Sequence, residues 1–250
     1  MRYFLSLASV MVLTLTGCSS VGVYQLHQHK PAARTAPRTI FIQAYTIQPG
    51  ALQLGDRPAA ETARLGRDIQ TSLASRTSRE VSRHAAPAMV AAGGTIPAPG
   101  NWLIRGEIVQ VDQGSRAKRA VVGLGAGRTH FRTNVSVFAV ESGGMRRILS
   151  FRTRGSSGME PGAALGVATG GASLVGTAAG TLAGSLPGVS SDVDRTAYET
   201  AAVLSTYLAN QGLLSRSRQQ VTPNFAGQVP SGFNVRRALP TPVRDAMDSH

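Results

Sequence analysis

Cys18 is the side chain of this sequence whose surroundings point most clearly to a chemical use. It follows Leu15-Thr16-Gly17, an aliphatic residue and two small residues, at the end of an apolar run that begins after Arg2. The run is shorter than the roughly 20 residues that a bilayer-spanning helix needs. A basic start, a short apolar stretch and small residues before a cleavage point are typical of a secretory signal. The chain has one cysteine, which excludes an intramolecular disulfide.

Residues 15–18 resemble the lipobox of bacterial lipoproteins, in which a diacylglycerol is attached to the cysteine sulfur before the signal is cleaved. The resemblance implies lipidation of Cys18 and three acyl chains on the mature N-terminus. Each buried CH₂ contributes roughly 0.8 kcal/mol, so three chains would hold the protein on a membrane permanently. The residue after the cysteine is Ser19. An Asp at this position would accompany inner-membrane retention. We therefore expect an outer-membrane anchor facing the periplasm, with an ordinary secretory signal as the alternative.

Glycine recurs at every fourth position in an uncharged, Gly/Ala-rich segment, residues 161–191. Four residues turn a helix by about 400°, so a ladder of this spacing stays near one helix face. A six-residue step separates two ladders and would place them on opposite faces of one straight helix. We therefore predict a helical hairpin over 159–190. Its candidate helix-packing residues are Gly162, Gly166, Gly170, Gly176, Gly180 and Gly184.

The same small-residue spacing also brings helices together inside membranes. Three interpretations of the segment therefore stay open: a compact packed hairpin, a membrane-inserted or oligomerising segment, and a mobile loop.

Arginine supplies nearly all of the positive charge, because only Lys30 and Lys118 are lysines. The formal net charge is +13, from 26 Lys and Arg against 13 Asp and Glu. The guanidinium fork matches the oxygens of phosphate and carboxylate groups. The candidate anion-binding residues are Arg116, Lys118, Arg119, Arg128, Arg132, Arg146 and Arg147.

The expected partners are a membrane, through the lipid anchor, and other envelope proteins or anionic lipid and cell-wall groups. A homo-oligomer is a further possibility. A cytoplasmic chain this basic would suggest nucleic acid, but export argues against that partner. A solvated, arginine-rich surface with no ligand is the alternative.

The motifs that would indicate catalysis are absent or stand in the wrong context. Gly123-x-Gly125-x-Gly127 lacks the helix that follows a dinucleotide fingerprint, because an alternating, strand-like run comes next. His27 and His29 are a single pair, too few for a defined metal site. We expect no catalytic residue, no metal and no cofactor besides the covalent lipid, and hence no enzyme.

The elements that would position these residues form an α+β domain over residues 38–214. Leu65, Ile69 and Leu73 give a helix one apolar face, and Gly143-Gly144 between two alternating runs predicts a hairpin. The predicted strands cover 38–47, 102–112, 129–141 and 145–154, and the predicted helices cover 59–85 and 192–213. We predict a small antiparallel sheet with two flanking helices and the Gly/Ala-rich helical hairpin.

Three segments are predicted to lie outside this domain. Residues 1–17 form the lipoprotein signal peptide, and residues 18–37 a flexible tether. Residues 215–250 are polar and proline-containing, which indicates a disordered basic tail.

Residues 114–119, Gly-Ser-Arg-Ala-Lys-Arg, are followed by Val-Gly-Leu-Gly-Ala-Gly at 122–127 and then by an alternating strand. This order resembles a family of bacterial lipoproteins catalogued as domain of unknown function 4410, over roughly residues 38–214. The resemblance implies an envelope lipoprotein with an α+β domain, and it brings no catalytic residues.

We therefore expect a membrane-anchored, non-catalytic periplasmic lipoprotein that binds or scaffolds envelope components. The alternative is an accessory component of a transport or secretion system whose Gly-rich segment inserts or oligomerises in the membrane.

Overall fold

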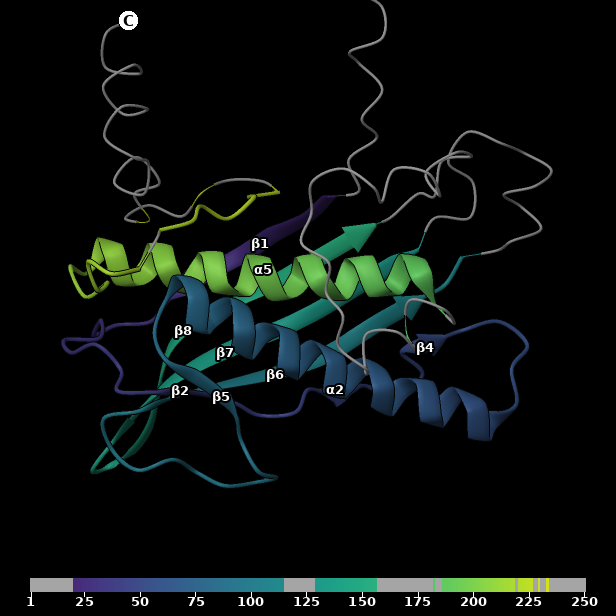
Figure 1. Ribbon diagram of the computed structural model, residues 1–250, viewed down its shortest axis with the longest axis horizontal. Helices are drawn as coiled ribbons and strands as arrows, with labels where there is room; N and C mark the ends of the chain where they lie inside the picture. Colours follow the sequence, from purple (N-terminus) through teal and green to yellow (C-terminus); the bar gives the residue numbers. More distant parts are fainter. Residues whose placement is uncertain are drawn as a thin grey trace, which may run out of the picture.

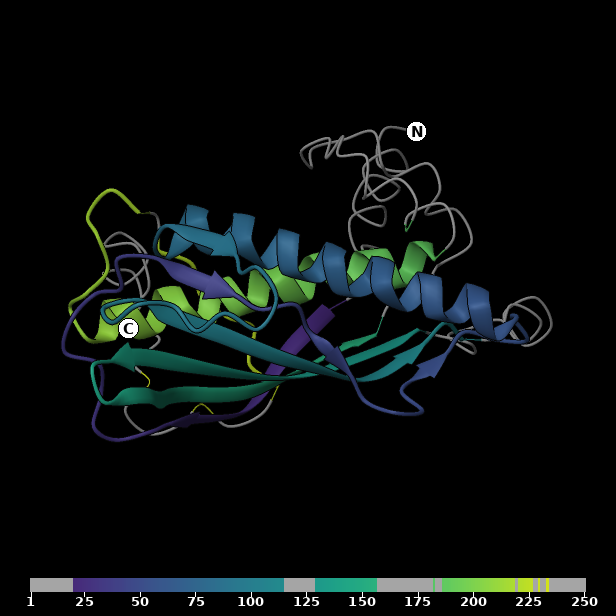
Figure 2. The same ribbon diagram turned by 90° about the horizontal axis from the view of Figure 1, so that it is seen from below.

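The computed structural model describes residues 20–114, 129–156, 186–218 and 220–226, together with Leu182, Val229 and Phe233. In this part of the chain one sheet carries two long helices on the same face (Figures 1 and 2). The predicted α+β class is confirmed. The predicted small antiparallel sheet is wrong in detail, because the sheet has eight strands and is mixed.

The strand order is β1-β8-β7-β6-β2-β5, and β3 and β4 also pair with β6. In the stretch β1-β8-β7-β6 each strand is antiparallel to its neighbour. β2, β3 and β4 instead run parallel to β6, and β5 runs parallel to β2. The strands are β1 (Ser20–Gln28), β2 (Ile40–Ile42), β3 (Thr46–Ile47), β4 (Leu52–Gln53), β5 (Ala88–Val90), β6 (Trp102–Asp112), β7 (His130–Glu141) and β8 (Gly144–Ser156).

The parallel part of the sheet follows from the position of the first helix in the chain. The helix α2 (Ala59–His84) separates β4 from β5 and returns the chain across one face of the sheet. Parallel strands need such a crossover, whereas antiparallel strands can be joined by a short turn. The predicted strand 38–47 is therefore two short strands, β2 and β3, that run along β6.

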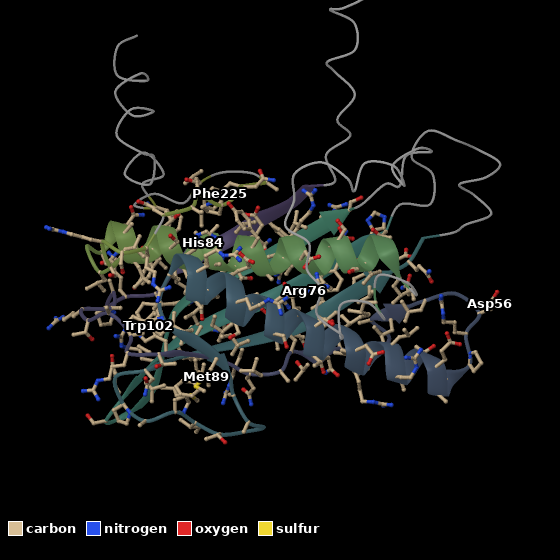
Figure 3. All side chains as sticks on the ribbon, viewed as in Figure 1. Asp56, Arg76, His84, Met89, Trp102 and Phe225 are labelled. Atoms are coloured by element: carbon tan, nitrogen blue, oxygen red, sulfur yellow. The ribbon has the colours of Figure 1, made fainter. Side chains whose placement is uncertain are left out.

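The helices α2 and α5 (Pro187–Asn210) lie side by side over the sheet (Figure 2). The helix predicted at 59–85 is confirmed within one residue, and the helix predicted at 192–213 begins earlier, at Pro187. Arg76 of α2 is buried and forms an ion pair with Asp194 of α5 where the helices pass each other (Figure 3). None of the helices in the described ranges has the length and apolar character needed to cross a membrane.

The core between helices and sheet requires a glycine on β6. Gly106 pairs with the buried Val135, so both residues face the helices. The ring of Tyr45, which is fully buried, lies directly on Gly106, and a Cβ at that position would overlap the ring.

The predicted tether, residues 18–37, is wrong over residues 20–28, because these form β1 at the edge of β8. Val21, Val23 and Leu26 are buried against the rest of the core. The strand β1 has few apolar residues, and their alternation is interrupted at Gln25, which has a φ of 51°. This strand is stabilised by β8, more than 100 residues later in the chain, and not by its own sequence.

The predicted disordered tail, residues 215–250, is wrong over residues 220–226, which we call the C-terminal strap. The strap lies along the outer edge of β1. The amide of Val23 donates to the carbonyl of Asn224 at 2.7 Å, and the amide of Ala226 donates to the carbonyl of Val23 at 2.8 Å. Phe233 is also buried.

The predicted hairpin over 159–190 lies almost entirely outside the described residues. Its last residues, from Pro187, belong to α5, and Leu182 and Leu186 are buried.

Candidate functional site

The face of the sheet that points away from α2 and α5 is not covered by a helix in the described ranges (Figure 2). On β7 the buried residues Phe131, Thr133 and Val135 alternate with the half-buried Arg132 and Asn134. Successive side chains of a strand point to opposite faces, so Arg132 and Asn134 point away from the helices. We call this surface, made by the outward residues of β1, β6, β7 and β8, the open face.

The strand register gathers three arginines on the open face. Arg132 of β7 lies opposite Arg154 of β8, and Asn134 lies opposite Arg152. Residues directly opposite on one face have Cβ atoms about 4.5–5.5 Å apart. We call Arg132, Arg152 and Arg154 the arginine cluster. Arg152 and Arg154 are exposed.

The arginine cluster is not neutralised by acids of the described part of the chain. None of its three members belongs to the ion pairs found there, and the Nε of Arg132 is buried without a hydrogen-bond partner among the described residues. Like charges directly opposite each other destabilise a strand pair. The pair Arg132–Arg154 is therefore a place where a bound anion would stabilise the sheet.

The acids of the open face are already hydrogen-bonded. Glu107 of β6 accepts from Nδ2 of Asn134 at 3.1 Å. Asp112, near the end of the same strand, accepts from the amide of Gly114 at 2.7 Å.

A histidine contributes to the open face near the middle of β8. Nε2 of His29 lies 3.0 Å from the hydroxyl of Ser150. Burial lowers the pKa of His29, and the charges of Arg147 and His27 lower it further. The lowered pKa favours the uncharged ring of His29. The residues of the described ranges contain no group of three or more His, Cys, Asp or Glu placed to hold a metal ion.

The structure separates the described members of the predicted anion-binding set. Arg132 and Arg147 lie on the open face, where Arg147 is opposite Phe138. Arg146 bonds Oε1 of Glu141 at 2.6 Å and also donates to the carbonyl of Pro31. The residues outside the described ranges are Arg116, Lys118, Arg119, Arg128, the lipidation candidate Cys18 and the helix-packing candidates Gly162, Gly166, Gly170, Gly176, Gly180 and Gly184.

The sequence prediction missed Arg152 and Arg154. Both stand in the strand predicted over 145–154 and alternate there with Phe151 and Thr153. That alternation shows that they face away from the core. Their position beside Arg132 depends on the register between β7 and β8.

A second polar site lies where α5 meets the C-terminal strap. Oε2 of Glu199 accepts the amide of Asn224 at 2.7 Å, and Nδ2 of Asn224 donates to the carbonyl of Val21 at 3.0 Å. Burial raises the pKa of Glu199 to about 7, although the hydrogen bond from Asn224 and the charge of Arg195 lower it. This carboxyl group is occupied by backbone and 7% exposed, so it is placed to hold the strap and not to reach a substrate.

A family model described as domain of unknown function (DUF4410) matches residues 40–173. Among solved structures, the chain is similar to a PelC dodecamer from Paraburkholderia phytofirmans, at 9% identity and a TM-score of 0.40, over 78% of this chain and 100% of that chain. It is also similar to the hypothetical protein CT253 from Chlamydia trachomatis, at 11% identity and a TM-score of 0.40, over 69% of this chain and 98% of that chain. No curated protein matches this chain in sequence.

Proposed function

This chain belongs to the family described as domain of unknown function DUF4410, and with that membership as premise we propose that it is a membrane-anchored, non-catalytic lipoprotein of the bacterial envelope. Lipid on Cys18 holds it at the periplasmic side of the outer membrane, and its folded body binds or scaffolds other envelope components. The observation that carries the proposal is Leu15-Thr16-Gly17-Cys18 directly after a short apolar run.

The hydrogen bonds that the titratable groups make support binding over catalysis. Glu199 is buried and holds the amide of Asn224. Glu107 accepts from Asn134, and His29 is bonded to Ser150. The arginine cluster, in contrast, offers donors to a ligand.

A protein partner, including a second copy of this chain, has a suitable surface at β5. This strand ends the sheet order, and Met89 and Val90 are 51% and 44% exposed. An exposed edge strand presents unpaired backbone groups that another strand can join.

The first experiment is mass spectrometry of the natural protein isolated from envelopes. We expect an N-terminus at Cys18 that carries acyl chains. An unmodified thiol, or a chain that still begins at Met1, would refute the proposal. The Cys18→Ser variant is the control and should keep its signal peptide.

The second experiment is photo-crosslinking in cells. A crosslinking residue at Ser136, on the open face, or at Met89, on β5, should recover a defined partner. The control position is Arg67, which is exposed on α2. Recovery of the same products from all three positions, or of monomer only, would count against a scaffolding role.

A second candidate function is favoured by the glycine ladders, which run from Gly162 to Gly184. In it the chain is an accessory component of a transport or secretion system, and this segment inserts or oligomerises in the membrane. The unlipidated Cys18→Ala protein should then form multimers and stay with membranes through washes in high salt and alkaline carbonate. A monomer that these washes release would exclude the second candidate.

A further inference from the structure

We propose that the arginine cluster binds the phosphate groups of membrane lipids and thereby holds one end of the open face against the bilayer. The inference rests on the proposed function, because Cys18 sets where the membrane lies. It adds a second contact to the lipid anchor and fixes how the body is oriented.

The first argument is the position of the cluster relative to the anchor. β1 begins at Ser20, which pairs with Ser156 of β8. Cys18 stands two residues before Ser20, a distance that an extended chain spans in about 7 Å. Arg154 stands two residues before Ser156, again about 7 Å along the strand. The start of β1, which follows Cys18 by two residues, and the cluster therefore belong to the same end of the sheet.

The second argument is charge. The cluster has three guanidinium groups, none of them in an ion pair within the described ranges. The two acids of β6 on the same face, Glu107 and Asp112, already accept hydrogen bonds. A phosphate accepts two parallel N–H bonds from one guanidinium, and an anion held between Arg132 and Arg154 would remove their mutual repulsion.

The third argument selects lipid as the source of the phosphate. A soluble anion or a wall polymer could bind the arginine cluster at any position on the body. A cluster beside the anchored end of β1 is instead held at the headgroup layer, which occupies the outer several ångströms of each leaflet. Each arginine near an anionic surface increases binding by roughly fivefold, so three together should contribute about 100-fold.

The experiment uses the full mature chain with Cys18→Ala, which removes the anchor and leaves the cluster. Its partition onto vesicles is measured by flotation, on phosphatidylcholine with and without phosphatidylglycerol and at several salt concentrations. We expect binding only to the anionic vesicles, and weaker binding as salt screens the charges. Adding R132Q, R152Q and R154Q should lower the partition coefficient by about 100-fold.

The matched control replaces three exposed arginines of α2 with glutamine, R64Q, R67Q and R83Q, and so removes the same charge from the other side of the body. It should bind nearly as well as the parent. Circular dichroism confirms that both triple variants are folded. Equal loss in the two variants, or unchanged binding of the cluster variant, would overturn the inference.

A further arm tests an acidic polymer, polygalacturonate, in place of vesicles. Tighter cluster-dependent binding to the polymer than to anionic vesicles would also overturn the inference. The vesicle and polymer experiments are independent of the mass spectrometry of the natural N-terminus. An acylated Cys18 with an inert cluster refutes the lipid contact alone, whereas an unmodified Cys18 refutes the proposed function whatever the vesicles show.

Discussion

Glu199 lies where the last helix, the first strand and the C-terminal strap meet. Its carboxylate accepts the amide of Asn224, and the side chain of the same asparagine reaches the carbonyl of Val21. One buried acid thus connects three segments that are far apart in the sequence. Because its pKa is about 7, the charge at this junction changes within the ordinary range of pH.

The first prediction concerns Glu199→Gln. The folded-state pKa is raised from 4.5 to about 7, so the folded protein keeps this proton up to a higher pH than the unfolded chain. The resulting stability is fully present below about pH 4.5 and is lost as pH rises through 7, by about 3 kcal/mol in total. Glutamine keeps an acceptor oxygen but has no charge.

The free energy of unfolding of the variant should therefore equal that of the wild type near pH 4.5. At pH 8 it should be higher than that of the wild type by up to about 3 kcal/mol. Urea denaturation at both pH values measures the difference. Asp56→Asn, at an exposed loop position, is the control. A Glu199→Gln effect of equal size at both pH values would contradict the assigned pKa.

The second prediction concerns Gly106→Ala. A methyl group at this position would overlap the buried ring of Tyr45, and overpacking a core typically costs about 1–3 kcal/mol. We expect the free energy of unfolding to fall by about 2–3 kcal/mol, because a fully buried ring must shift within a packed core. Gly143→Ala is the control, since nothing lies within 4 Å of a Cβ there. Equal urea midpoints for the two variants would show that Tyr45 does not depend on Gly106.

At the scale of strands and helices, sequence periodicity predicted the elements whose own residues form the apolar face. Alternation in β7 and the four-residue spacing of Leu65, Ile69 and Leu73 in α2 are local patterns, and both elements were placed within about one residue. β1 and the C-terminal strap have no such pattern, because each is fixed by a neighbour that is distant in the chain.

The arginine cluster was missed because the hairpin contains an irregularity. Counting back from the turn at Gly144 would place Arg132 opposite Thr153. The register shifts by one residue beyond Phe138, and Arg132 lies opposite Arg154 instead. A one-residue slip exchanges the two faces of a strand, so the cluster cannot be deduced without this bulge.

The third prediction concerns the C-terminal strap. A chain that ends at Leu214 lacks the carbonyl of Asn224, which accepts the amide of Val23. We expect hydrogen exchange at Val23 to become at least about tenfold faster, because a loss of about 1.4 kcal/mol of protection has that effect. A chain that ends at Phe233 keeps the strap and is the control. Unchanged exchange in the shorter chain would show that the strap does not protect β1.

At the scale of the whole molecule, the fold already includes β1 from Ser20 onward, 18 residues before the predicted start of the domain at residue 38. The N-terminal strand supplies Val21, Val23 and Leu26 to the shared core. Full burial of such a side chain contributes about 1.5–3 kcal/mol. This amount is large beside the 5–15 kcal/mol by which domains are usually stable.

The fourth prediction compares two chains that begin at different residues. A chain from Ser19 should fold with the stability of the mature protein. A chain from Arg38 lacks β1 and should lose at least about 4 kcal/mol, which leaves it marginal or unfolded at 25 °C. Circular dichroism and urea denaturation measure both. A stable, cooperative chain from Arg38 would show that β1 is dispensable.

If the chain is exported as proposed, the pairing of Ser20 with Ser156, and of Val23 with the strap, has a consequence for the order of export and folding. A chain that passes through a secretion channel N-terminus first delivers β1 long before its two neighbours. Until residues 220–226 emerge, this edge of the sheet stays open, and the body cannot close around its first strand. Translocation would therefore be almost complete before folding ends, and a chain tethered early by its lipid would finish its assembly already on the membrane.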